Sequence, residues 1–143
     1  MPGSSDPTVI RSIAVGAEDV VTALEADRRS GRNPVLRVTP PFSGRMRARM
    51  HRGGATDYED EPAPIHVDPA DLVTDSAPSY PIPAETEDAL RDDPSVEYTR
   101  ARHHERHAAA VADWREAVAD HVVDTVTLDT LSGPHEVSVT VLG

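Results

Sequence analysis

The chain has 143 residues, a formal net charge of −11 at pH 7 and no cysteine. Its length corresponds to one domain, and a domain of this size buries enough surface to form a core without disulfides. The composition excludes a disulfide framework, a thiolate nucleophile and a cysteine-based zinc site, and the absence of a long apolar run or a signal-peptide pattern predicts a cytoplasmic protein without membrane contact.

The N-terminal part of the chain predicts a tail, a strand and a helix. Residues 1–8 indicate a flexible tail, and residues 9–143 a single domain. Apolar and polar residues alternate from Val9 to Val15, as in a strand. A helix follows, with acids in its first turn at Glu18 and arginines in its last turn before Gly31, an arrangement that suits the helix dipole.

Residues 35–52 predict a β-hairpin with a five-residue connection at 40–44. The first strand is Val35–Val38, and the second has strict period-two alternation. Three arginines and a histidine share one face of the second strand: Arg45, Arg47, Arg49 and His51. Met46, Ala48, Met50 and Arg52 share the other.

The rest of the chain predicts an acidic flexible loop followed by alternating helices and strands. The loop covers residues 53–63. The expected elements after it are a strand at 65–67, a short helix capped by Asp68, a short helix at 85–91, a long helix from Ser95 to about Val122, and a C-terminal hairpin with strands at 123–131 and 136–142.

These elements together predict an α+β fold. We expect a mostly antiparallel sheet of about five strands, formed by the two hairpins and the strand at 65–67. Two main helices would pack on one face of this sheet, with Trp114 of the long helix near the centre of the core.

The distribution of basic residues gives the strongest functional signal. Eight of the fourteen lie between Arg28 and Arg52 with no acidic residue among them, although the chain as a whole is acidic. Arginines at i, i+2 and i+4 of a strand lie about 6.6–6.8 Å apart, close to the spacing of phosphates along a nucleic-acid strand, and arginine binds phosphate bidentately.

Other interpretations of the same arginines remain open. In one, the arginines protect an edge strand from aggregation. In another, they dock on an acidic protein. In a third, they pair with the acids of the chain's own loop between Asp57 and Glu61. The candidate contact residues are the two strands' arginines and the phenylalanine of the turn: Arg37, Arg45, Arg47, Arg49, Arg52 and Phe42.

His103 and His107 stand four residues apart on one helix face, a spacing that suits zinc. The metalloprotease pattern requires a glutamate directly after the first histidine, and His104 stands there instead. No phosphate-binding glycine loop or nucleophile elbow is present. The sequence therefore provides no positive case for catalysis and indicates no cofactor. We expect a structural role for the two histidines, and a metal site on them is the third hypothesis.

The composition resembles that of small acidic haloarchaeal proteins. The chain contains no lysine, every basic residue is arginine, and the acid excess keeps such proteins soluble where salt screens charge. The segment from Val35 to Arg49, in which every basic residue is arginine, also carries this resemblance. The resemblance implies a habitat and no mechanism.

We therefore expect a small non-enzymatic module that contacts nucleic acid or a nucleoprotein through its arginine-lined strand. The alternative is a protein-interaction subunit whose same strand docks on an acidic partner or adds to the partner's sheet.

Overall fold

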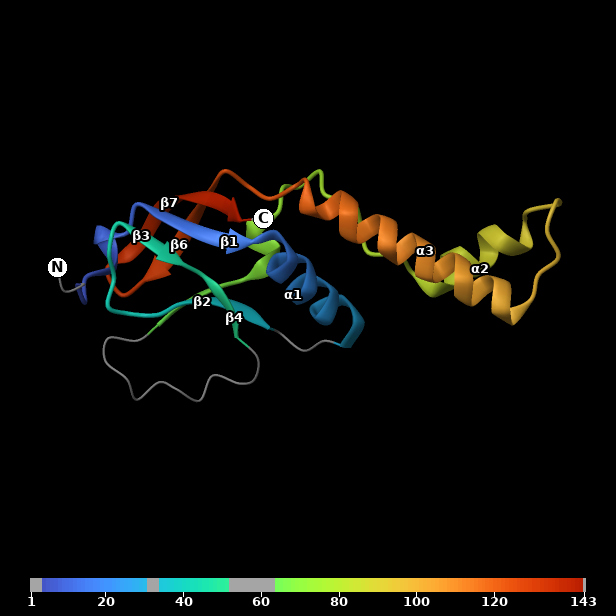
Figure 1. The fold of residues 1–143 in the computed structure, drawn as a ribbon, viewed down its shortest axis with the longest axis horizontal. Helices are drawn as coiled ribbons and strands as arrows, with labels where there is room; N and C mark the ends of the chain where they lie inside the picture. The colour runs from blue at the N-terminus through green and yellow to red at the C-terminus, as the bar shows by residue number, and fades with distance from the viewer. Residues whose placement is uncertain (1–3, 31–33, 52–63, 143) are drawn as a thin grey trace.

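The computed structural model describes residues 4–30, 34–51 and 64–142 (Figure 1). Over these ranges the chain forms three α-helices, two short 3-10 helices and seven strands. The helices are α1 (Ala17–Ser30), α2 (Pro83–Arg91) and α3 (Arg100–Ala119), with η1 (Pro7–Val9) and η2 (Pro69–Leu72). The strands are β1 (Ser12–Gly16), β2 (Val35–Val38), β3 (Arg45–Arg47), β4 (Arg49–His51), β5 (Ile65–Val67), β6 (Thr125–Thr130) and β7 (Gly133–Leu142).

The larger sheet has four strands in the order β3-β1-β7-β6. β1 lies parallel to both of its neighbours, with Ser12 opposite Arg45 on β3 and opposite Ser138 on β7. β6 and β7 form the antiparallel C-terminal hairpin that the sequence predicts. Gly133 in its turn has φ 101°, a conformation that only glycine adopts without strain.

The smaller sheet has three strands in the order β4-β2-β5, all antiparallel. It is joined to the larger sheet by the continuous segment 45–51, which leaves one sheet and enters the other at Ala48. β5 also contacts β6, so the strands surround one core. Inward-facing residues such as Ile13, Leu36 and Val67 are buried there.

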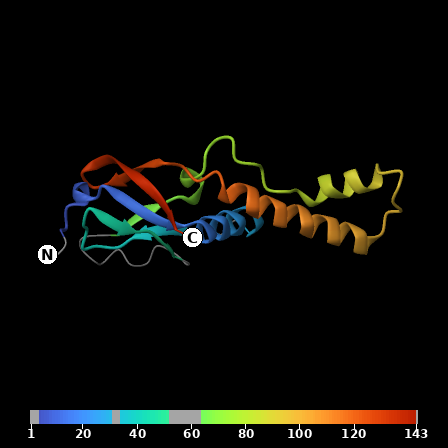
Figure 2. The same cartoon turned by 45° about the horizontal axis from the view of Figure 1, so that its top comes forward.

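α1 packs against β1, β2 and β4, with Val20 and Leu24 buried. α3 has a different role, because it contacts α1 and α2 and extends away from the sheets (Figures 1 and 2). Only its last turns, with Trp114 and Val118 buried, reach the core. α2 and α3 therefore form a projecting arm in which Leu90 is fully buried.

The expected fold is right in class and wrong in arrangement. The chain is α+β, but it forms two sheets in place of one antiparallel five-stranded sheet, and the larger sheet is mixed. The expected covering of the sheet by the long helix is also wrong. Alternation of apolar residues identifies the buried face of a strand, but it does not identify the strand's neighbour.

Two local boundaries also differ from expectation. α3 begins after Thr99, whose hydroxyl accepts from the Arg102 N–H, whereas the Ser95 hydroxyl donates to the Asp93 carboxylate and caps no helix. Ser4 forms a β-bridge with Phe42, so the described part of the expected tail packs on the domain.

The expected loop at 53–63 lies outside the described residues. No helix within the described ranges is both long and apolar enough to span a bilayer.

Candidate nucleic-acid interface

The segment 45–51 keeps the alternation that the sequence predicts. Arg45, Arg47 and Arg49 are exposed, whereas Ala48 is fully buried. The three arginines nevertheless belong to two sheets, because β3 pairs with β1 and β4 pairs with β2. Their side chains follow the outside of a bent segment and do not form a row on one flat strand.

Arg11 joins this surface although it lies far away in the sequence. The parallel pairing of β1 with β3 places it beside the start of β3, where its backbone N–H donates to Gly44 O (2.8 Å). Arg11 and Arg45 line a shallow hollow of about 450 Å³ together with Val9, Ser12 and Gly44. The Arg11 side chain passes close to Gly44, with its Cδ 3.9 Å from the position of a Cβ there. We call Arg11, Arg45 and Arg47 the arginine face.

The residues in register with Arg45 and Arg47 on the neighbouring strands are small and uncharged. Ser12 lies opposite Arg45, and Ser138 on β7 continues that row. Ala14 lies opposite Arg47, and Thr140 continues the next row. None of the three guanidinium groups forms an ion pair or hydrogen bond with any residue that the structure describes. Their donors therefore remain available to an anion from outside.

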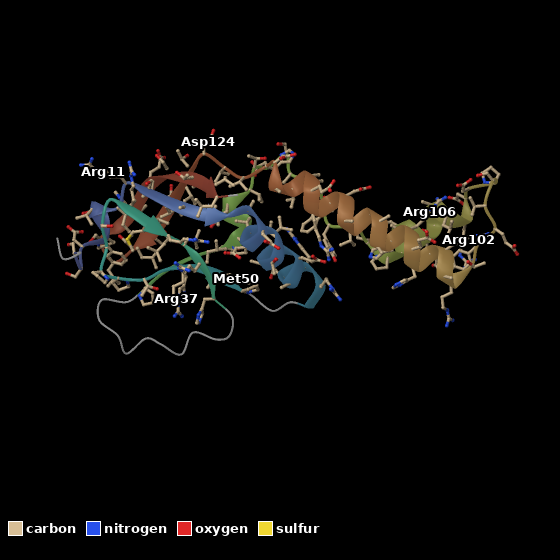
Figure 3. The ribbon with its side chains drawn as sticks, in the orientation of Figure 1. Arg11, Arg37, Met50, Arg102, Arg106 and Asp124 are labelled. Atoms are coloured by element: carbon tan, nitrogen blue, oxygen red, sulfur yellow. The ribbon has the colours of Figure 1, made fainter. Side chains whose placement is uncertain are left out.

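Arg49 and Arg37 belong to the outer face of the smaller sheet. They lie directly opposite each other, and His66 on β5 continues the row across the sheet. The His66 ring also stacks with that of His51, at 6.4 Å between centroids. Burial, followed by the neighbouring charge of Arg37, lowers the pKa of His66 below its ordinary value of 6.5. Figure 3 shows Arg11 and Arg37 projecting from different sides of the molecule.

Comparison with known proteins places the chain in a family. Over residues 1–143 it matches the family described as Domain of unknown function (DUF8009). The chain belongs to this family. No curated protein and no solved structure matches it significantly. The family description names no activity.

The other residues considered for partner contact are not part of the arginine face. Phe42 is buried, with 2% of its surface exposed, so its ring belongs to the core and is not offered to a partner. This corrects its place among the contact residues. Arg28 and Arg29 lie at the end of α1, in a pocket formed with α3. Arg52 and the acids from Asp57 to Glu61 lie outside the described residues.

The two histidines with zinc-like spacing, His103 and His107, are hydrogen-bonded within the arm, and His135 is bonded elsewhere in the domain. His103 Nε2 and His107 Nδ1 lie 3.1 and 3.0 Å from the Thr86 hydroxyl oxygen, which donates to Pro83 O. His135 Nε2 donates to Ile10 O (2.6 Å). Across the described ranges, no three histidine or carboxylate side chains converge on a metal position. These histidines connect α2 to α3, and β7 to the start of β1.

The sequence signal for Arg11 is weak, because one isolated arginine before a strand has no distinguishing pattern. Its neighbourhood with Arg45 depends on a parallel pairing between segments more than thirty positions apart. A cluster of basic residues along the chain is visible by inspection, whereas a cluster assembled by sheet topology is not.

Proposed function

We propose that the chain is a small non-enzymatic module that contacts the phosphate backbone of nucleic acid, alone or in a nucleoprotein, through the arginine face. Arg49 extends this contact around the bend, and Arg37 is auxiliary. The observation that carries the proposal is the presence of three exposed guanidinium groups that pair with no described acidic residue, in a protein of net charge −11.

The surroundings of the arginine face favour a contact that does not depend on base sequence. Ser12, Ser138 and Thr140 supply hydroxyl groups that bond phosphate or sugar oxygens. The aromatic residues Phe42, Tyr80 and Trp114 lie in the core or beside the arm, so no ring from them is available for base stacking. We also propose a haloarchaeal origin on the composition. Bidentate arginine–phosphate pairs would then be needed, because high salt weakens long-range attraction.

The test is binding of a single-stranded RNA homopolymer across a salt titration, followed by fluorescence anisotropy. Each phosphate contact contributes about 0.7 to the slope of log K against log salt for a single strand. The double variant Arg45→Ser/Arg47→Ser should therefore bind more weakly and lower that slope by about 1.4. Arg11→Ser alone should lower it by about 0.7.

A matched control has the same change in charge at a distant place. Arg100→Ser/Arg102→Ser removes two arginines near the tip of the arm, where Figure 3 shows Arg102, and should leave the slope unchanged. The proposal fails if the unaltered protein retains no RNA or DNA at any salt concentration, or if both double variants lower the slope equally.

A second candidate function is supported by the position of β3 at the edge of its sheet. Ser12 N–H donates to Gly44 O, and Ala48 N–H donates to Ala14 O. The backbone groups of the even-numbered residues from Gly44 to Ala48 therefore form the hydrogen bonds to β1. Arg45 and Arg47 therefore direct their backbone groups to the edge that no described strand covers, where the strand of a protein partner would add.

The two functions respond differently to proline. Proline removes a backbone donor that strand addition needs. A protein complex formed at the β3 edge should therefore survive nuclease treatment and Arg47→Ser but be lost with Arg47→Pro. Nucleic-acid binding should decrease equally in both variants. Equal retention of a protein complex by both variants would exclude strand addition.

A further inference from the structure

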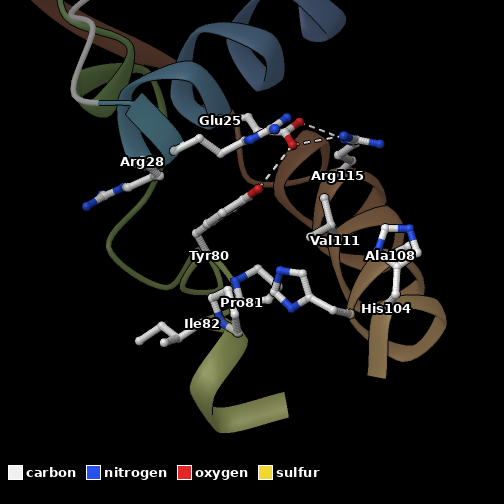
Figure 4. Close-up of a pocket in the computed structure, with 12 residues that line it drawn as sticks. Glu25, Arg28, Tyr80, Pro81, Ile82, His104, Ala108, Val111 and Arg115 are labelled. Atoms are coloured by element: carbon white, nitrogen blue, oxygen red, sulfur yellow. Dashed lines mark hydrogen bonds and ion pairs between the residues drawn. The ribbon is translucent and has the colours of Figure 1, made fainter. Parts of the chain in front are cut away.

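A second hollow lies where the arm meets the rest of the domain. It has a volume of about 690 Å³ and is formed by α1, the segment 80–83 and α3 (Figure 4). This volume is within the range of about 300–1,000 Å³ that is usual for small-molecule sites. The arginine face does not contribute to it.

The carboxylate in this pocket already accepts three hydrogen bonds from the pocket wall. Arg115 Nε donates to Glu25 Oε1 (2.7 Å), and Arg115 Nη2 donates to Glu25 Oε2 (2.8 Å). The Tyr80 hydroxyl donates to Oε2 as well (3.1 Å). These bonds, led by those from Arg115, hold the pKa of Glu25 below its ordinary value of 4.5. Glu25 therefore remains ionised and is paired within the pocket wall.

The remaining charges of the pocket wall are positive. Three arginines and one glutamate line it, which gives a formal charge of 3 − 1 = +2 without the histidines. Arg28 and Arg29 are exposed, and neither forms an ion pair or hydrogen bond with a described residue. His104 adds a further donor on the α3 side. A dianion would neutralise this excess, whereas a monocarboxylate would leave one positive charge.

The rest of the lining is apolar. Pro81, Ile82 and Pro83 form one side, and Val111 lies on the other. Ile82 is 51% exposed, which is unusual for a large apolar side chain and leaves apolar surface for a ligand to cover. The pocket thus combines two exposed arginines with an apolar wall.

We propose that this pocket binds a phosphate monoester of a small apolar molecule. Arg29 binds the phosphate dianion together with Arg28, whose side chain turns in from the outward position that Figure 4 shows. Ile82 and Val111 contact the apolar body. The paired Glu25 and Arg115 join α1 to α3 in the pocket wall. This site is independent of the proposed nucleic-acid contact.

The probe for this proposal is phenyl phosphate, measured by titration calorimetry on the full chain. Phenyl phosphate should bind at least about tenfold more tightly than inorganic phosphate, phenol or benzoate, because each of these lacks the apolar body or the dianion. Emission from Trp114, the sole tryptophan, should change on binding because its ring lies 4.8 Å from that of Tyr80 in the pocket wall.

Two variants test the residues. Arg28→Ser/Arg29→Ser should weaken phenyl phosphate at least about tenfold, since two charge-assisted contacts are lost. Ile82→Asp, at an exposed position, places a carboxylate in the pocket and should weaken it by a similar factor. Circular dichroism confirms that each variant is folded, and Arg45→Ser/Arg47→Ser, with the same charge change elsewhere, should bind phenyl phosphate as the unaltered protein does.

Three results would overturn the proposal. They are an absence of phenyl phosphate binding, equal affinity for phenyl phosphate and any of the three comparison compounds, and unchanged affinity in Arg28→Ser/Arg29→Ser. None of them bears on RNA binding by the arginine face, so the two proposals fail separately.

Discussion

Replacement of Glu25 by glutamine removes the charge that joins α1 to α3. The Glu25 side chain is 12% exposed, whereas that of Arg115 is 50% exposed. Glutamine retains one acceptor oxygen and turns an amide donor toward a guanidinium donor. The variant therefore loses at least one charge-assisted bond, worth about 1.5–3 kcal/mol when buried.

The exposure of Arg115 reduces this cost, because water solvates the guanidinium once its partner is gone. We expect Glu25→Gln to lower the free energy of unfolding by about 1–2 kcal/mol at neutral pH. For a chain of this length the melting temperature should fall by roughly 3–6 °C. Urea denaturation followed by Trp114 emission measures the first quantity, and a thermal scan measures the second.

The pH dependence separates an electrostatic cause from a packing defect. Because folding lowers the pKa of Glu25, its contribution is complete above the unfolded value of 4.5 and is lost as the pH falls through the folded value. The difference between the two proteins should therefore shrink in acid. Glu116→Gln, an exposed change of the same charge on α3, is the matched control and should lie within about 0.5 kcal/mol of the unaltered protein.

Two results would refute this reasoning about Glu25. One is a loss at neutral pH no larger than that of Glu116→Gln. The other is a loss of unfolding free energy that stays constant as the pH falls below 4.5, which would show that altered packing and not lost charge causes the destabilisation.

Three further predictions concern the sheets. Phe42→Ala should cost about 3–5 kcal/mol in urea denaturation, because the ring is buried; a loss below about 1 kcal/mol would show that the ring is not part of the core. Ala48→Leu should cost about 1–3 kcal/mol by overpacking the point where the two sheets meet, whereas Arg49→Ala should change stability by less than about 0.5 kcal/mol. In an NMR titration the pKa of His66 should lie below 6.5 and should rise partway in Arg37→Ser, since burial persists there; a value at or above 6.5 would contradict the burial.

Much of the local structure follows from the sequence, for identifiable reasons. α1 has acids in its first turn and arginines in its last, and the C-terminal hairpin has two alternating runs around a glycine. The faces of the segment 45–51 are also predictable, because period-two alternation determines which side chains are buried. Each of these features depends on neighbours a few residues apart.

The sequence alone also determined the acidity, the absence of cysteine and the clustering of arginines before residue 53. Only the tertiary structure decided which arginines lie together. The parallel pairing of β1 with β3 brings Arg11 beside Arg45. Arg28 and Arg29 lie instead in the pocket with α3, and Arg49 lies opposite Arg37 on the second sheet. The physical reason is that strand alternation specifies a face, whereas the choice of neighbouring strand depends on how the whole core is filled.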